Sequence, residues 1–104
     1  MDESNFHELA DEMLERLMDS LEMLEESDIE TDLVDGVLTV TLPDGNEIVL
    51  NKHAPTAQLW LSSPASGAGY FSYNEDDDIW EDPDGQALEE TLSADLNRLA
   101  GVEL

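Results

Sequence analysis

The sequence contains no cysteine, which excludes disulfides, thiolate nucleophiles and metal or cluster sites with thiolate ligands. Any metal must therefore be held by oxygen or imidazole ligands. Basic residues are scarce too, because 3 Lys and Arg stand against 27 Asp and Glu, giving a formal net charge of -24. Such a surface repels phosphate backbones and anionic lipid headgroups, so we expect neither nucleic acid nor membranes as partners. It would instead attract cations and basic protein surfaces.

Long hydrophobic runs are also missing. No apolar run approaches the ~20 residues that a membrane span needs, and the acidic start of the chain is unlike a signal or transit peptide. We therefore expect a cytoplasmic protein of bacterial type, or a protein of the mitochondrial matrix if this is a eukaryotic mature form. A chain of 104 residues with 40% hydrophobic residues can still bury one core, so we expect a single domain over residues 1–104.

Residues 6–24 show the periodicity of an amphipathic helix, because apolar residues recur at steps of three and four. Ser4 is the predicted N-cap of this helix. The opposite side of the helix is acidic throughout, and it carries Glu8, Asp11, Glu12, Glu15, Asp19, Glu22 and Glu26.

The middle of the chain is typical of an antiparallel sheet. Asp35-Gly36 and Asp44-Gly45 are hairpin signals that separate short β-branched runs. The pattern predicts six strands, over residues 29–34, 37–42, 47–51, 58–62, 70–73 and 79–81.

The strand over residues 58–62 alternates, so that Leu59 and Leu61 face the core and Trp60 faces the other way. A Trp among polar residues on an open face is typical of an interface anchor, although a half-buried surface aromatic has the same pattern. Trp80 is expected in the core between sheet and helix.

A second helix is predicted near the end of the chain. Asp84 is its predicted N-cap, its leucines from Leu88 to Leu99 lie on one face, and Gly101 is its stop. Both helices can bury their apolar stripes on the same side of the sheet. The fold class is therefore α+β: a two-layer sandwich of an antiparallel sheet of five to six strands with N- and C-terminal helices on one face.

Residues 51–67, with the sequence NKHAPTAQLWLSSPASG, resemble the signature of the frataxin family, an Asn-Lys-Gln-x-Pro segment followed by Gln-Ile-Trp-Leu-Ser-Ser-Pro-x-Ser-Gly. The order of elements, the Phe6-His7 start and Trp80 extend the resemblance over nearly the whole chain. The start is most similar to the bacterial, CyaY-type members. Two positions differ, since His53 stands where the family has Gln, and residues 68–70 lack the basic residues that many members carry there.

The resemblance implies a frataxin-like fold, weak and exchangeable binding of Fe2+ or Fe3+ on an acidic ridge, and docking on a complex of cysteine desulfurase and iron–sulfur scaffold protein. Carried over by position, the docking residues are Asn51, Gln58 and Trp60. The metal ligands are Asp11, Glu15, Asp19, Glu22, Glu25, Glu26, Asp28, Glu30 and Asp32, with His7 as a lesser candidate one turn from Asp11.

Oxygen ligands also suit other hard cations, so the sequence does not select a metal. The implied protein is an accessory or regulatory component of iron–sulfur cluster assembly and not an enzyme, monomeric or assembled by metal. The main alternative is a ferroxidase or iron-storage protein, although no Glu-x-x-His pair of a di-iron bundle is present. A mimic of nucleic acid is a third hypothesis. A purely solvated, salt-adapted acidic surface is the simplest explanation of the charge.

Overall fold

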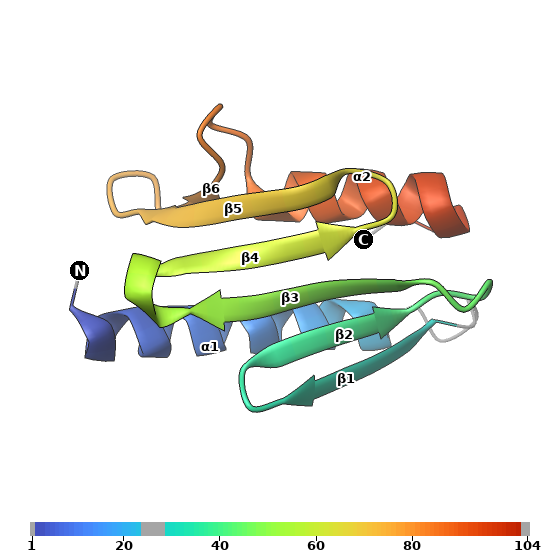
Figure 1. Ribbon diagram of the computed structural model, residues 1–104, viewed down its shortest axis with the longest axis horizontal. Coiled ribbons are helices and arrows are strands. Elements are labelled where there is room, and N and C mark those ends of the chain that lie inside the picture. Colours follow the sequence, from blue (N-terminus) through green and yellow to red (C-terminus); the bar gives the residue numbers. More distant parts are fainter. Residues whose placement is uncertain (1, 24–28, 103–104) are drawn as a thin grey trace.

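The computed structural model describes residues 2–23 and 29–102. Within them, two α-helices, α1 (Glu3–Glu22) and α2 (Leu88–Ala100), cover one face of a six-stranded antiparallel sheet, as Figure 1 shows. The strands lie side by side in chain order: β1 (Glu30–Val34), β2 (Val37–Thr41), β3 (Glu47–His53), β4 (Gln58–Ser63), β5 (Gly67–Asn74) and β6 (Ile79–Glu81). A short 3-10 turn, η2 (Ala54–Thr56), joins β3 to β4. The predicted two-layer α+β sandwich is confirmed.

The two predicted hairpin turns differ in length. Asp35 and Gly36 both have positive φ, 51° and 76°, which makes the tight two-residue turn between β1 and β2. The β2–β3 connection is longer. There the Gly45 N–H donates to the Leu42 carbonyl at 2.9 Å, and the Leu42 N–H donates to the Asn46 carbonyl at 2.8 Å.

The start of α1 differs from the prediction. Asp2, not Ser4, is the N-cap, because its side chain accepts a hydrogen bond from the Asn5 N–H at 2.7 Å. Ser4 lies inside the first turn. The two residue types are about equally good caps, so the sequence pattern alone did not separate them. The turn predicted after this helix, near Glu26, falls outside the described residues.

The start of α2 also differs, because the chain stays extended for longer than predicted. Asp84 is not the cap; it belongs to a turn in which the Asp82 side chain accepts the N–H groups of Asp84 and Gln86, each at 2.9 Å. A β-bridge between Glu81 and Ala87 then holds the backbone in the sheet, so the helix begins only at Leu88. Gly101, with φ 68°, ends it as predicted.

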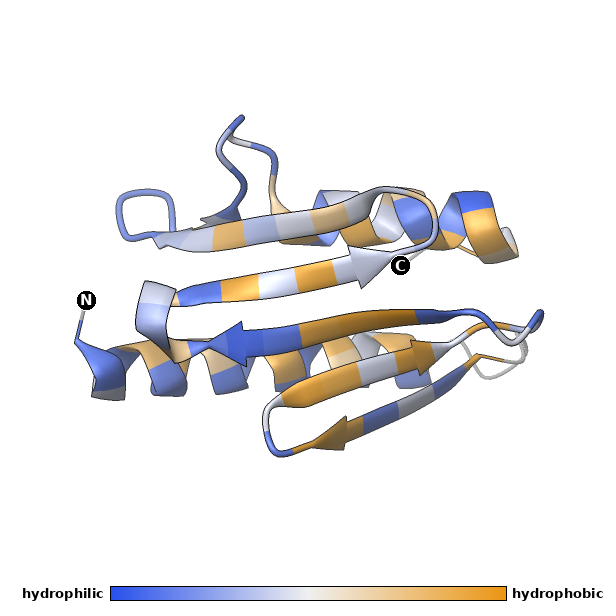
Figure 2. Cartoon of the chain, in the orientation of Figure 1, coloured by the Kyte–Doolittle hydropathy of each residue, from blue (hydrophilic) through white to orange (hydrophobic). Residues whose placement is uncertain are grey.

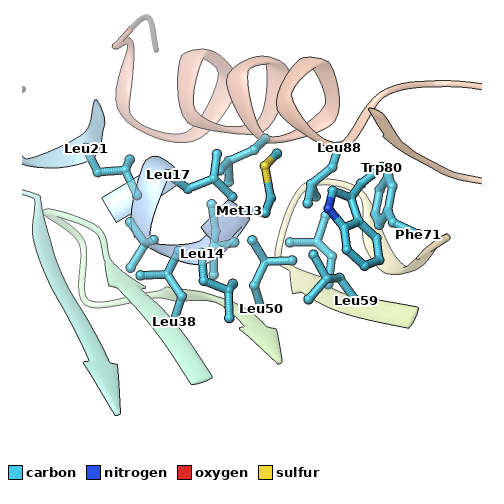
Figure 3. Packing of buried hydrophobic residues seen from close by; sticks show 14 of the residues in the cluster. Met13, Leu14, Leu17, Leu21, Leu38, Leu50, Leu59, Phe71, Trp80 and Leu88 are labelled. Atoms are coloured by element: carbon cyan, nitrogen blue, oxygen red, sulfur yellow. The ribbon is translucent and has the colours of Figure 1, made fainter. Parts of the chain in front are cut away.

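The core lies between the helix layer and the covered sheet face. Figure 2 shows apolar residues alternating with polar ones along the strands, and Figure 3 shows leucines of α1 and of the sheet meeting Trp80 and Phe71. Trp80 is 4% exposed and contacts Phe6 and Tyr73 edge-on, so its predicted core position is confirmed. None of the helices in the described part of the chain is long and apolar enough to cross a membrane.

Candidate metal-binding helix face and docking surface

The acidic side of α1 faces solvent. Its carboxylates repeat at three- and four-residue steps, and all of those in the described part of the helix face are exposed: Glu8, Asp11, Glu12, Glu15, Asp19 and Glu22. We call these six residues the α1 carboxylates. Like charges spaced four residues apart on a helix destabilise it by a few tenths of a kcal/mol per pair, and a bound cation would relieve that repulsion.

One α1 carboxylate already has a cationic partner. The Lys52 ammonium of β3 lies 2.7 Å from the Asp11 carboxylate, and the Lys52 side chain is only 18% exposed. Its end lies against Gly36 in the β1–β2 turn. Asp11 is therefore the predicted metal ligand whose charge is most compensated within the protein.

His7 forms its ion pair with a residue at the start of α1 and not with one in the middle of the helix. Its Nε2 lies 3.7 Å from the Glu3 carboxylate, one turn earlier, and its ring contacts Phe6. The described contacts thus favour a helix-end histidine balanced by a neighbouring acid. They give no pairing of His7 with Asp11.

The predicted ligands outside α1 lie elsewhere. Glu30 and Asp32 are exposed and pair in register with Thr41 and Thr39, on the face of the sheet away from the helices. Leu33, the residue after Asp32, points to the opposite side of the strand and packs on the core. The remaining three predicted ligands, Glu25, Glu26 and Asp28, lie outside the described residues.

Nowhere in residues 2–23 and 29–102 do three His, Asp or Glu side chains converge on a point that could hold a metal ion. The α1 carboxylates project from a convex surface, so a cation there keeps most of its water. What this arrangement fits chemically is shallow, exchangeable binding of hard cations through oxygen.

The uncovered side of the sheet, which we call the open face, carries Trp60. The His53 ring stacks on the indole at 3.7 Å between centroids with 13° between planes, and Tyr70 meets it edge-on at 5.1 Å. The indole N–H donates to the Gln58 side chain at 3.1 Å. Trp60 is thus half-buried, held between two neighbouring rings, with the rest of the indole accessible.

The three predicted docking residues lie together on the open face. Asn51 is directly opposite Trp60 in the β3–β4 register, and Gln58 lies two residues before Trp60 on the same strand. The Gln58 amide donates to the Ser72 hydroxyl at 3.2 Å, which fixes its orientation. Sequence reasoning missed Tyr70, although its place opposite Trp60 follows once the β4–β5 register is known.

Charge is nearly absent from the centre of the open face. On β2 to β5 the outward positions are Val37, Thr39, Thr41, Glu47, Val49, Asn51, His53, Gln58, Trp60, Ser62, Ala68, Tyr70, Ser72 and Asn74. Glu47, at the beginning of β3, is the one carboxylate among them. In a chain of 27 acids, this neutral surface is the clearest departure from an evenly solvated exterior.

These features define a small acidic α+β sandwich with a carboxylate-rich helix and a neutral, aromatic sheet face. The Frataxin-like domain model matches residues 1–102, and the chain belongs to the frataxin family. It is 36% identical over 104 residues to mitochondrial frataxin of Dictyostelium discoideum, covering 95% of this chain but only 54% of that protein. The chain thus spans about half the length of that relative.

Bacterial relatives match over most of their length. The chain is 35% identical over 94 residues to the iron-sulfur cluster assembly protein CyaY of Thioalkalivibrio sulfidiphilus, covering 88% of this chain and 87% of that one. Among solved structures, frataxin from Psychromonas ingrahamii has a TM-score of 0.85 at 25% identity, covering 100% and 96% of the two chains. A trimeric frataxin from the yeast Saccharomyces cerevisiae, solved "complexed with ferrous", has a TM-score of 0.78 at 32% identity, covering 90% and 87%.

Proposed function

We propose that this protein is an accessory component of iron–sulfur cluster assembly, which docks through its open face on a complex of cysteine desulfurase and scaffold protein. The α1 carboxylates bind iron weakly and meet basic surfaces of that complex. The names of the bacterial relatives support a role in this process. A cytoplasmic location is part of the same proposal.

The observation that carries the proposal is the segregation of charge between the two faces. Interface centres are depleted in charged residues and enriched in aromatic ones. The open face has this composition around Trp60, whereas the exposed side of α1 is acidic. A protein that needed only solubility would have no reason to keep the centre of one face nearly free of charge.

The docking proposal is tested by replacing Trp60→Ala and measuring affinity for the purified desulfurase–scaffold complex by calorimetry. A central aromatic anchor is worth ~2 kcal/mol or more, so we expect a loss of at least about thirtyfold in affinity. Thr41→Ala, on the same face beside the edge strand, is the matched control and should bind as the unaltered protein does. Equal affinities for all three proteins would remove the proposal.

For iron, the proposed ligands are the α1 carboxylates that lack a described cationic partner, Glu15, Asp19 and Glu22 above all. The three residues fall at four- and three-residue steps, so neighbouring carboxylates can share one hydrated cation. Iron is cargo in this proposal, and its exchange is expected to be fast.

The iron proposal is tested by titrating Fe(II) without oxygen and following paramagnetic broadening by NMR. We expect broadening to concentrate on α1 and to weaken in the triple variant Glu15→Gln, Asp19→Asn and Glu22→Gln. A control with the same charge change uses Glu47→Gln, Glu75→Gln and Asp76→Asn, all exposed and away from α1. Even broadening over all acidic residues, unchanged by the first variant, would mean simple counterion binding.

We also propose that the protein is not an enzyme, in contrast to the ferroxidase alternative. A ferroxidase needs ligands that hold iron in a defined centre, and no three His, Asp or Glu side chains of residues 2–23 and 29–102 come together around one point. Oxygen uptake after addition of Fe(II) should equal that of buffer with the same iron. Faster uptake that saturates with protein would support the alternative.

The proposed state without metal is a monomer, because two copies with a net charge of -24 repel each other. The yeast relative was solved as a trimer, so Fe(II) is the condition under which assembly is expected. Sedimentation with and without Fe(II) measures this directly, and an oligomer in metal-free buffer would contradict the proposed state.

A further inference from the structure

A cavity of about 270 Å³ opens between the two helices and the β5–β6 hairpin. Among the residues proposed above for iron or for docking on the open face, Glu12 alone lines it. The cavity lies in the helix layer, whereas Trp60 projects from the opposite side of the sheet. It is therefore separate from the open face and from the main proposed iron ligands, Glu15, Asp19 and Glu22.

The inner wall of the cavity is apolar and aromatic. Met13 and Trp80, 5% and 4% exposed, form its base with Tyr73 beside them, and Leu9 and Ile79 are half-buried at its sides. Figure 3 shows Met13 of α1 and Trp80 on the two sides of Leu88, which belongs to α2. A rigid apolar base of this kind binds hydrocarbon or sulfur-containing side chains by excluding water.

The rim of the cavity is acidic. The helices contribute Glu12, Glu89 and Glu90 to it. The β5–β6 hairpin contributes Asp78, whose carboxylate accepts a hydrogen bond from the Tyr73 hydroxyl. Arg16 is the one cation in the lining, and its guanidinium is occupied by Glu89 at 2.8 Å. No Lys, Arg or His within residues 2–23 and 29–102 pairs with Glu12 or Glu90.

We propose that this cavity receives one large apolar side chain from a basic segment of a partner protein, and that Lys or Arg residues flanking that side chain pair with Glu12 and Glu90. The volume lies below the ~300 Å³ at which pockets for drug-sized ligands begin, so it suits a single anchor side chain. The acidic rim selects basic neighbours for that anchor by charge complementarity.

A second copy of this chain does not fit the site. The sequence has 3 Lys and Arg in all, and two of them, Arg16 and Lys52, are engaged within the chain. A copy could therefore offer little positive charge to an acidic rim. A basic partner protein can supply both the apolar side chain for the base of the cavity and the positive charges for its acidic rim. The proposal depends on neither iron nor Trp60.

The test uses the full chain and two blocked peptides, Lys-Arg-Leu-Arg-Lys and the same peptide with Ala in place of Leu, in about 0.15 M salt to screen long-range attraction. The two indole N–H signals in the NMR spectrum distinguish the surfaces, since Trp80 lines the cavity and Trp60 lies on the open face. We expect saturable shifts of Trp80 and of the Met13 methyl group with the Leu peptide. Binding of the Ala peptide should be about tenfold weaker.

Matched double variants distinguish the effect of the rim carboxylates from the effect of the overall negative charge. Glu12→Gln with Glu90→Gln should weaken the Leu peptide several-fold more than Glu8→Gln with Glu47→Gln, although both pairs change the net charge equally. The proposal is overturned if the two peptides bind alike, if Trp60 shifts in place of Trp80, or if both double variants lose the same affinity. Saturable binding of butylamine as tight as that of the Leu peptide would also overturn it, because the cavity would then be a small-amine site.

Discussion

His53 replaces a family glutamine with an aromatic ring, and that ring covers one side of Trp60. We predict that His53→Ala exposes the indole, so that acrylamide quenches tryptophan fluorescence more strongly and the emission shifts to the red. Trp80, at 4% exposure, adds an almost constant buried background. His53→Gln, which restores the family residue, should shift the signal the same way.

A control for this experiment is Thr56→Ala. The Thr56 hydroxyl lies 2.7 Å from His53 Nδ1, so its loss removes a polar contact of the imidazole but leaves the stacked ring in place. Quenching should then stay near that of the unaltered protein. If His53→Ala left quenching unchanged, the stack would not be what shields Trp60. The sequence marked this position as unusual, but stacking depends on the pairing of His53 with Gln58 across two strands, which no local pattern reveals.

Gly36 is a second position where one residue decides a contact between distant segments. It has φ +76°, and a Cβ placed there would lie 2.4 Å from Lys52 Cε. Gly36→Ala therefore strains the backbone and also pushes the Lys52 ammonium away from Asp11. Gly67, with φ +79° and open space around its Cα, separates the two effects.

Both alanine variants should lose ~1–2 kcal/mol of unfolding free energy from the left-handed backbone. Gly36→Ala should lose up to about 1 kcal/mol more, the range of a partly exposed ion pair. Urea unfolding measures the difference. Equal losses of unfolding free energy in the two variants would mean that the Lys52 side chain can move to another position without destabilising the protein.

At the scale of elements, one hydrogen bond ties the β4–β5 loop to α2. The Asp95 side chain on α2 is buried at 6% exposure and accepts the Ser66 hydroxyl at 2.6 Å. Ser66→Ala leaves that buried carboxylate without its hydrogen-bond donor, which should cost ~1–3 kcal/mol in urea unfolding. Ser62→Ala, exposed on β4, is the control and should change stability by less than about 0.5 kcal/mol. A loss as small for Ser66→Ala would show that water replaces the serine.

The sequence predicted the strands better than the helix starts. Alternation of apolar and polar residues sets which side of each strand is buried, so the faces of β2 to β4 follow from the pattern. Helix starts depend on competing hydrogen bonds. Asp84 has the chemistry of a cap, but Asp82 and the Glu81–Ala87 bridge hold its backbone in another conformation. That competition is not visible in residue types alone.

At the scale of the molecule, the candidate site was predictable in composition and less so in arrangement. Helical periodicity placed the α1 carboxylates correctly, because burial of the opposite stripe fixes the rotation of the helix. It gave no hint that Lys52, forty-one residues from Asp11 along the chain, would neutralise that residue. The placement of Glu30 and Asp32 on the open side of the sheet depends on strand register. Long-range pairing is what the sequence alone leaves undetermined.

Because the net charge is -24, the stability of the fold should increase with salt concentration. A protein stabilised mainly by ion pairs would show the opposite dependence. The molecule measures 38 × 27 × 20 Å, so at about 0.01 M salt the Debye length of ~30 Å lets nearly every pair of carboxylates repel. At about 1 M salt the Debye length is ~3 Å, and only adjacent charges interact. Ion pairs such as Lys52–Asp11 and Arg16–Glu89 lose strength over the same range, but they are few. We therefore predict that the urea midpoint rises steadily with NaCl from low to high concentration. A midpoint that falls would mean that those ion pairs outweigh the repulsion among the acids.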